Sequence, residues 1–593
     1  MIGQTEPPDF YVAPEETPVR WWEPLLAWVI VWLVLLALLP NILDKLDPVT
    51  GDEPFYLVTA ISLLHDHDLD EANNYANKDY WEFAPSCQEM NRPHWGDVGE
   101  VPINNVPGIL APGLRNDCVG LPLPLDALST LPPHTSQGTI RPGQYTKHGI
   151  GLSVLIAPAF ALGNRPLVVV FLAALAALVA VNVWLLAFET TGRRFVAWLS
   201  YALMAFSVHL LPFSFLIFPA TPAALLAVYA WRRLRLSARA QQLNLPYYQP
   251  NGPFRTLVIG ACIGFLPWLH SVYLSLSLFL FLYWALGGRI GRWLGQLFSR
   301  QPRPQTEFKQ TLGERLGKIF PAGWSPLALA FFFMPVIILG ALFVSYYIYY
   351  YGTPMPNTQD HAGFAPLIEI PTGLLGLLFD QKYGMLIYGP FYLLAFCGLW
   401  LMFRRQKDAV ETAANRSDLA WMVVVAGPYL LIMGDYKQWW GEWGPPARYL
   451  VPVVPLLAVP LAHALFQLKG WLAKIFLVVT TAWSLAFSAI FMYNPHVMYN
   501  WQTNNPATSL RWLEANVPFL KDASLGKYFP SYVTHLTING GQPNVLAAML
   551  WLGGALSLIV LLVFFGEGKT MQPPTYSPQP GIRVPLGLTN PHH

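Results

Sequence analysis

The sequence has few charged residues: Asp, Glu, Lys and Arg together make up 12% of its 593 positions. An ordinary soluble domain carries roughly 25%. Hydrophobic residues reach 54%, so the composition excludes a soluble globular protein and predicts a polytopic membrane protein. Nothing in it suggests a nucleic-acid partner.

Cysteine is also scarce, with four residues in the whole chain. Cys87 and Cys118 lie in one acidic loop, where an oxidising outer environment would allow them to form a disulfide. Sequence spacing does not show that the two side chains meet, so a disulfide and two free thiols both remain open. Cys262 and Cys397 lie in apolar segments, which is typical of packing residues.

The N-terminus lacks the basic start and the small-residue cleavage site of a signal peptide. Acids and prolines precede the uncharged run 25–43 instead, and this run is close to the roughly 20 residues needed to span a bilayer. We therefore expect a retained first transmembrane helix. Together with eleven later apolar segments it gives about twelve spans, predicted at 25–43, 166–188, 195–211, 213–231, 256–270, 271–287, 325–350, 384–403, 419–433, 448–467, 473–492 and 545–565.

Lys and Arg are concentrated in alternate connections between these segments. The first loop of the other set, 44–147, holds fifteen acidic residues but only six basic ones. Cytoplasmic loops of membrane proteins carry the excess of Lys and Arg. This alternation of basic and non-basic connections therefore predicts a multi-pass protein of the plasma membrane with both termini cytoplasmic.

We expect an all-α protein in which interfacial helices and loops at the outer face cover the transmembrane helices. Its parts are an N-terminal cytoplasmic tail 1–24, the first helix 25–43, an outer loop 44–165 with interfacial helices, a bundle 166–492 with outer loops 351–383 and 434–447, an outer loop 493–544, the last helix 545–565 and a flexible cytoplasmic tail 566–593. The segment 150–162 is apolar but too short to span, which favours an interfacial or re-entrant piece. Since no soluble catalytic domain is expected, any chemistry would come from the outer loops.

The motif GDEPFY places Asp52 and Glu53 directly before Pro54. Proline suits the first turn of a helix and disfavours helical geometry in the residue before it, so a helix should begin at Pro54. Either acid could cap this helix. One acid could instead face a cavity, as a general base or as a ligand of a divalent cation with His148. Which of the two acids faces the cavity stays open.

The residues after this motif predict a short helix with one inward apolar stripe, lying along the membrane surface. The stretch HDHDLD then places Asp66, Asp68 and Asp70 like the start of a calcium loop. An EF-hand is excluded, because Glu71 and Asn77 stand at its obligatory Gly and Glu positions. A solvated polar turn is expected, with a looser cation site as the alternative.

Basic and aromatic residues gather at three other predicted outer positions. Lys147 and His148 precede the short apolar segment, Lys382 and Tyr383 follow Asp380 at the head of a span, and Arg448 stands in the aromatic-rich stretch GDYKQWWGEWGPPARYL. Interfacial anchoring explains such residues in many membrane proteins. However, Arg448 on the outer side opposes the usual charge bias, and a lipid phosphate is a natural partner for an arginine fork.

The motifs GDEPFY, YTKHGIGLSVLIAPAFALG and PPARYL, in this order, resemble the GT-C membrane glycosyltransferases. Within that superfamily, the chain is most similar to bacterial relatives of the protein mannosyltransferases and aminoarabinose transferases, over most of residues 20–500. The resemblance implies transfer of a sugar from a polyprenyl-phosphate donor to a lipid, glycan or protein acceptor at the outer face of the cell envelope.

The resemblance also implies that Asp52 or Glu53 is the catalytic base. It implies that Lys147, Lys382 or Arg448 lies near the donor phosphate. One departure concerns FLIFPATPAAL, where relatives often carry an acid after the proline and this chain has Ala220 and Thr221.

Two other functions remain open. The departure at Ala220 fits a catalytically inactive GT-C-like subunit of a membrane complex, assembled with protein partners. A transporter or lipid flippase is the less favoured alternative, because transporters place ionisable residues near mid-membrane and the spans here are nearly free of charge. The proline-rich spans 211–222 and 450–460 keep it open.

Overall fold

The computed structural model describes residues 19–45, 51–83, 135–136, 138–242, 252–298, 326–354, 363–404, 409–441, 444–500, 506–521, 523–532 and 545–565. Within these ranges the secondary structure is helical, apart from two isolated β-bridges. The α-helices are α1 (Trp22–Lys45), α2 (Glu53–Ile61), α3 (Ala72–Asn77), α5 (Gly151–Thr191), α6 (Arg194–Ala205), α7 (Ala220–Gln242), α8 (Pro253–Leu269), α9 (Leu274–Phe298), α11 (Pro326–Tyr351), α12 (Ile370–Phe379), α13 (Met385–Tyr388), α14 (Leu393–Phe403), α15 (Ala409–Asp435), α16 (Ala458–Gln467), α17 (Trp471–Tyr493), α18 (Thr508–Asn516) and α19 (Val545–Phe565).

Apolar helices make this chain a membrane protein. In the described part, six helices are long and apolar enough to cross a bilayer, namely α1, α5, α11, α15, α17 and α19. Shorter apolar helices pack among them, and α11 and α19 leave most of their apolar surface exposed. The predicted all-α membrane architecture is thus confirmed for the described residues.

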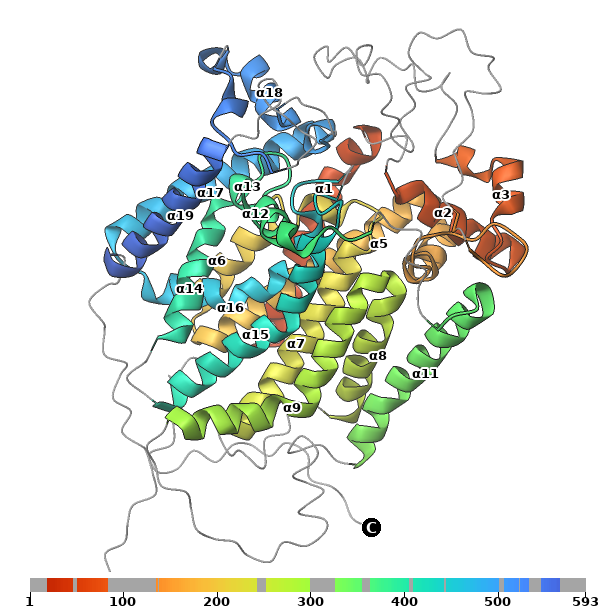
Figure 1. Cartoon of the computed structure of the whole chain (residues 1–593), viewed down its shortest axis with the longest axis horizontal. Helices are drawn as coiled ribbons and strands as arrows, with labels where there is room; N and C mark the ends of the chain where they lie inside the picture. The colour runs from red at the N-terminus through yellow and green to blue at the C-terminus, as the bar shows by residue number, and fades with distance from the viewer. Residues whose placement is uncertain are drawn as a thin grey trace, which may run out of the picture.

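The helices form one bundle with two different ends (Figure 1). At one end lie α2, α3, α12, α13 and α18, and we call it the loop end. We call the opposite end the arginine end, where Arg194 pairs with Glu23 and Arg235 pairs with Asp418. Two arginines of the predicted basic connections therefore pair with acids at the arginine end.

Helix α5 contains a break between two segments that the sequence analysis treated as separate. Its residues Gly163 and Asn164 leave helical geometry, with Asn164 in the left-handed region at φ 49°. The break separates the short apolar segment 150–162 from the long one that follows. Arg165 stands directly after it.

Helix α2 is buried on every side, which corrects the prediction of a single inward stripe. It begins one residue earlier than predicted, at Glu53, and all nine of its residues are buried. It packs against α5, where the Ser153 hydroxyl donates to the Tyr56 carbonyl at 2.9 Å. Local periodicity could not predict this burial, because the segments that surround α2 lie far from it in the sequence.

Prolines shift or divide three of the predicted spans. The span predicted at 213–231 begins instead at Ala220, after Pro219, and α7 then runs on to Gln242. The span at 448–467 starts with two 3₁₀ turns, and α16 begins only at Ala458. Pro390 separates α13 from α14 in the span at 384–403. Proline lacks the N–H that would continue each helix.

Candidate functional site

An ion pair joins Asp52 to Arg448 at the loop end. The Arg448 Nη2 donates to the Asp52 Oδ2, although the two residues are nearly four hundred positions apart. Asp52 occupies the N-cap position of α2, but its side chain makes no capping hydrogen bond. Helix capping therefore does not explain the position of Asp52. The side chains of Asp52 and Arg448 are 25% and 14% exposed, so the pair is partly open to solvent.

Several groups hold the Arg448 guanidinium in place. Its Nη1 donates to the Gly441 carbonyl at 2.9 Å, and its Cζ lies 4.1 Å from the ring centroid of Phe218. Burial opposes the charge, but the Asp52 carboxylate outweighs this and raises the pKa of Arg448 above its ordinary value. Arg448 is therefore a fixed cation with an aromatic ring on one side.

Glu53 lies beside this pair and is only 3% exposed. Burial raises the pKa of its carboxyl to about 7, against the opposing effects of the Arg165 charge and a hydrogen bond from the Ile217 backbone. Near neutral pH, Glu53 therefore exists in both protonation states, as suits a group that exchanges protons. The adjacent acids thus differ: Asp52 is partly exposed and paired, whereas Glu53 is buried.

His148 packs against α2, one turn beyond these acids. Its ring is 5.7 Å from that of Phe55 and 5.2 Å from that of Tyr56, between centroids. The structure thus brings His148 to the same helix as Glu53, in an aromatic setting. Lys147 is partly buried and, among the described residues, no hydrogen bond or ion pair joins it to Asp52 or Glu53.

The turn after α12 forms a second group of candidates. The Asp380 carboxylate accepts hydrogen bonds from the backbone N–H groups of Lys382 at 2.8 Å, Tyr383 at 3.2 Å and Tyr532 at 2.8 Å. Three such bonds hold the turn and attach it to the segment that precedes α19. Asp380 therefore has a structural role in this turn.

Lys382 and Tyr383 point to different neighbours. Lys382 is 2% exposed, and burial lowers its pKa to about 7, with Asp380 favouring the charge and Arg511 opposing it. Tyr383 is closer to the first group, because its carbonyl accepts from the Ala447 N–H at 2.8 Å. The predicted residues thus divide into two groups that meet where Tyr383 contacts the residue before Arg448.

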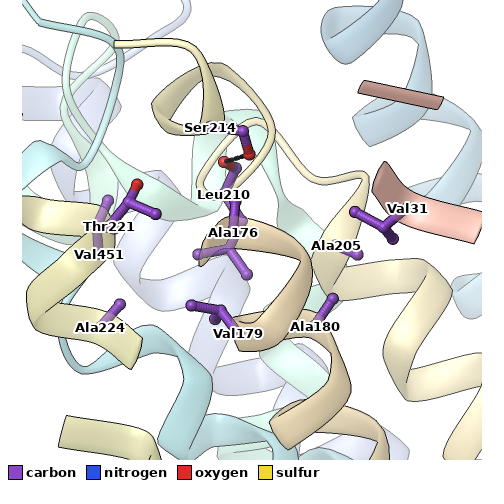
Figure 2. Close-up of a pocket in the computed structure, with 10 residues that line it drawn as sticks. All are labelled: Val31, Ala176, Val179, Ala180, Ala205, Leu210, Ser214, Thr221, Ala224 and Val451. Carbon is purple, nitrogen blue, oxygen red and sulfur yellow. Dashed lines mark hydrogen bonds between the residues drawn. The ribbon is translucent and has the colours of Figure 1, made fainter. Parts of the chain in front are cut away.

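A small pocket lies deeper in the bundle, between α1, α5, α6 and α7 (Figure 2). It has room for about one water molecule. Its two hydroxyl groups are already engaged, since Ser214 donates to the Leu210 carbonyl at 3.0 Å and Thr221 donates to the Phe213 carbonyl at 2.7 Å. Thr221 therefore lines an apolar pocket.

The predicted polar turn is present after α2. Asp70 accepts from the backbone N–H groups of Ala72 at 3.1 Å and Gln144 at 2.8 Å, and Asp68 accepts from that of Asp70 at 3.0 Å. Asp66 accepts from the Asn74 amide at 2.8 Å. These contacts explain the acids as loop-holding groups.

The described residues contain no group of three or more His, Cys, Asp and Glu side chains that could hold a metal ion. Asp52, Glu53 and His148 therefore do not form such a group, and Asp52 is already bonded to Arg448. Cys87 and Cys118 lie outside the described residues, so their pairing stays a prediction. Cys262 and Cys397 are buried free thiols, as expected.

Sequence reasoning missed Arg165 and Phe218. Arg165, directly after the break in α5, lowers the pKa of Glu53 through its positive charge. The only sequence signal for this residue was a single charge between two apolar segments. Phe218 is one of many aromatic residues, and nothing local distinguishes it. Comparisons with protein-family models, with curated proteins and with solved structures found no match to this chain.

Proposed function

We propose that this protein is an integral membrane glycosyltransferase of GT-C-like architecture, with twelve spans, both termini in the cytoplasm and the loop end at the outer face of the plasma membrane. It would transfer a sugar from a polyprenyl-phosphate donor to a lipid, glycan or protein hydroxyl. The observation that carries the proposal is the Asp52–Arg448 pair beside the buried Glu53, a combination of carboxylates and a fixed cation at the end of an apolar bundle.

In this mechanism Asp52 is the base, because it is the more exposed of the two acids. The acceptor oxygen forms a bond to the anomeric carbon while its proton passes to Asp52. The bond between that carbon and the phosphate oxygen breaks, and the polyprenyl phosphate leaves with the electron pair. Arg448 stabilises the negative charge that develops on the leaving phosphate.

Donor binding would also activate the base. In the absence of donor, Arg448 holds Asp52. A donor phosphate competes for the same guanidinium, since Arg binds phosphate oxygens in a fork. Asp52 then becomes available to the acceptor only when the donor is in place. Lys147, Lys382 and Tyr383 would contact more distant parts of the substrates.

The test uses membranes that contain the full-length protein and labelled polyprenyl-phosphate sugars. Wild type should transfer label to an acceptor, whereas Asp52→Asn and Arg448→Ala should lose at least 100-fold in rate, the size of a typical lost transition-state contact. Asp66→Asn, an exposed acid in the polar turn, is the matched control and should retain activity. Equal labelling by wild type and both variants would reject the site assignment.

A catalytically inactive subunit is the second candidate, favoured by Thr221 in its apolar pocket. It predicts no labelling by wild type with any donor, together with copurification of a partner protein. The transporter alternative instead predicts movement of a lipid-linked sugar across proteoliposomes without formation of a new glycosidic bond.

A further inference from the structure

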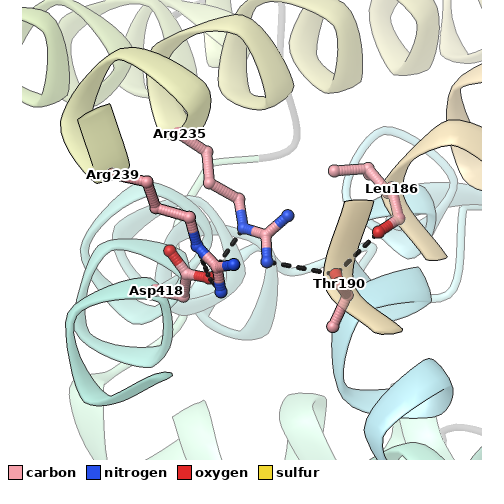
Figure 3. A network of polar contacts seen from close by, with 5 residues as sticks. All are labelled: Leu186, Thr190, Arg235, Arg239 and Asp418. Carbon is pink, nitrogen blue, oxygen red and sulfur yellow. Dashed lines mark hydrogen bonds and ion pairs between the residues drawn. The ribbon is translucent and has the colours of Figure 1, made fainter. Parts of the chain in front are cut away.

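The two ends of the bundle differ in how their polar side chains are engaged. At the arginine end, Asp418 of α15 accepts from the Arg235 Nε at 2.7 Å and from the Arg239 Nη2 at 2.5 Å (Figure 3). Arg235 also donates to the Thr190 hydroxyl at 3.0 Å. These side chains are partners of one another and tie α7 to α15 and α5. At the loop end, in contrast, two tyrosines beside the ion pair of the candidate site keep unengaged hydroxyl groups.

The first of them, Tyr56, lies one helical turn after Asp52, so the two side chains share a face of α2. The ring packs against that of His148 with 5.2 Å between centroids, and the residue is only 1% exposed. Within the described ranges, no hydrogen bond reaches the Tyr56 hydroxyl. A buried phenol normally has a hydrogen-bond partner. Tyr56 therefore brings an unsatisfied hydroxyl to the face of α2 that carries Asp52.

The second tyrosine, Tyr449, follows Arg448 in the chain. Its ring centroid lies 5.8 Å from the Arg448 Cζ. The Tyr429 hydroxyl donates to the Tyr449 carbonyl at 2.8 Å, and Gly441 packs against the ring so closely that a Cβ there would lie 3.3 Å from the Tyr449 Cε2. The ring is thus held beside the guanidinium. Its own hydroxyl forms no hydrogen bond with any residue that the structure describes.

The ion pair therefore lies among aromatic faces and uncharged hydroxyl groups. Phe218 covers the guanidinium of Arg448 at 4.1 Å from the ring centroid. A phenol hydroxyl both donates and accepts, as do the hydroxyls of a sugar, and aromatic rings pack well against the C–H faces of a sugar ring. A phosphodiester oxygen only accepts, and the arginine fork already supplies donors for it. The phenols thus match the sugar better than the phosphate.

The charges of the site favour a sugar without charge. Arg448 is a fixed cation, so it would repel the ammonium of an amino sugar. The two neighbouring acids do not compensate for this, because Asp52 is bonded to Arg448 and Glu53 is only 3% exposed. A carboxylate on the sugar would instead compete with the donor phosphate for the same guanidinium.

We propose that the hydroxyls of Tyr56 and Tyr449 hydrogen-bond an uncharged sugar, a hexose or pentose without amino or carboxyl groups, and so determine which donor the protein accepts. This assignment rests on the proposed function, which supplies the lipid-linked sugar and places its phosphate at Arg448. Tyr56 contacts the sugar on the side of Asp52, and Tyr449 contacts it near the phosphate.

Binding of lipid-linked sugars to the purified full-length protein, without acceptor, tests this assignment. Isothermal titration calorimetry in detergent compares a polyprenyl-phosphate hexose with polyprenyl methyl phosphate, which keeps the charge of the phosphodiester but has no sugar. Wild type should bind the hexose form at least tenfold more tightly. Tyr56→Phe and Tyr449→Phe should each reduce this preference about three- to tenfold, as expected for one lost hydrogen bond, and should bind the methyl diester like wild type.

Tyr528→Phe is the matched control, because it removes the hydroxyl of a 66% exposed tyrosine in the segment before α19, and it should bind the hexose form like wild type. Both test variants should keep the wild-type unfolding midpoint, since neither hydroxyl has a partner within the described part of the protein. Weaker binding then reports a lost sugar contact and not a lost fold. Equal hexose binding by wild type and both variants would overturn the assignment.

A polyprenyl-phosphate amino sugar tests the class of the ligand. It should bind at least tenfold more weakly than the hexose form, and tighter binding of the amino sugar would reject an uncharged ligand. Transfer of labelled sugar separates this assignment from the proposed function. Transfer without any effect of the two variants on hexose binding would reject only the role of the tyrosines. Tyrosine-dependent hexose binding without transfer would reject only the transferase activity.

Discussion

The carbonyl of Tyr383 accepts a hydrogen bond from the N–H of Ala447 at 2.8 Å, and this bond joins the two groups of candidate residues. On one side it continues through the turn held by Asp380. On the other it reaches Arg448, the next residue after Ala447. The position of the Arg448 guanidinium thus depends on the turn after α12 as well as on its own loop.

Replacing Asp380 should loosen this turn. In Asp380→Asn, one carboxylate oxygen becomes an NH₂ group facing backbone N–H donors, so at least one hydrogen bond is lost in a fully buried place. We expect a loss of about 2–4 kcal/mol in the free energy of unfolding. Thermal unfolding in detergent measures it. An unchanged midpoint would show that the three bonds do not hold the turn.

Gly441 should be intolerant of a side chain. Its φ of 79° is left-handed, and a Cβ there would lie 3.2 Å from the Arg448 Cδ. Gly441→Ala should cost about 1–2 kcal/mol in stability and reduce sugar transfer further by displacing Arg448. Gly427→Ala in α15 is the control, because its Cβ would meet only Val423 at an ordinary 3.8 Å. Full transfer activity in Gly441→Ala would contradict this account.

Stability should fall as pH rises through the range set by Glu53. Its pKa is about 7 in the folded protein against 4.5 for the free group, so the folded state binds the proton more tightly. The resulting penalty is absent below pH 4.5, grows between pH 4.5 and 7, and reaches at most about 3 kcal/mol above this range. Glu53→Gln should abolish this part of the slope in thermal unfolding scans.

Glu71 provides a comparison for the same experiment. It is buried, its pKa is raised to about 8 by burial, and it accepts from the Thr59 hydroxyl at 2.5 Å. The Glu71→Gln variant should keep the fall in stability that Glu53 causes between pH 4.5 and 7. It should lose the contribution of Glu71, which extends from pH 4.5 to about pH 8. If both variants followed the wild-type curve, the two buried acids would not be the source of the pH dependence.

Arg448 should be needed for more than its charge. Arg448→Lys keeps a cation but loses the fork that reaches both Asp52 and the Gly441 carbonyl. We expect transfer to fall about tenfold or more while stability changes by no more than about 1 kcal/mol, because the pair is partly exposed. Steady-state transfer rates and unfolding midpoints separate the two effects. Wild-type activity in this variant would mean that a point charge suffices.

The sequence indicated Asp52 and Arg448 as candidates because each departs from a membrane-protein norm, one as an acid beside a helix start and the other as a cation on the predicted outer side. It could not show that they contact each other, since the contact depends on how α2 packs at the end of the bundle. The same limit explains why Lys382, with similar local signals, interacts with Asp380 and Arg511 instead.

Helix boundaries were predictable where the apolar run was uninterrupted, as in α19. They were shifted where prolines interrupt the run, as before Ala220 and Ala458. The burial of α2 was missed because its local pattern resembles that of an interfacial helix, and only the long-range packing of α5 distinguishes the two.

The two ends of the bundle are fastened with unequal strength. Asp418 joins α7 to α15 through the fully buried Arg235, whereas Asp52 and Arg448 meet at a contact that solvent reaches. Water weakens the second contact far more than the first. If the helices separate, the contact at the loop end should therefore open first, while Arg235 keeps α7 and α15 together at the other end.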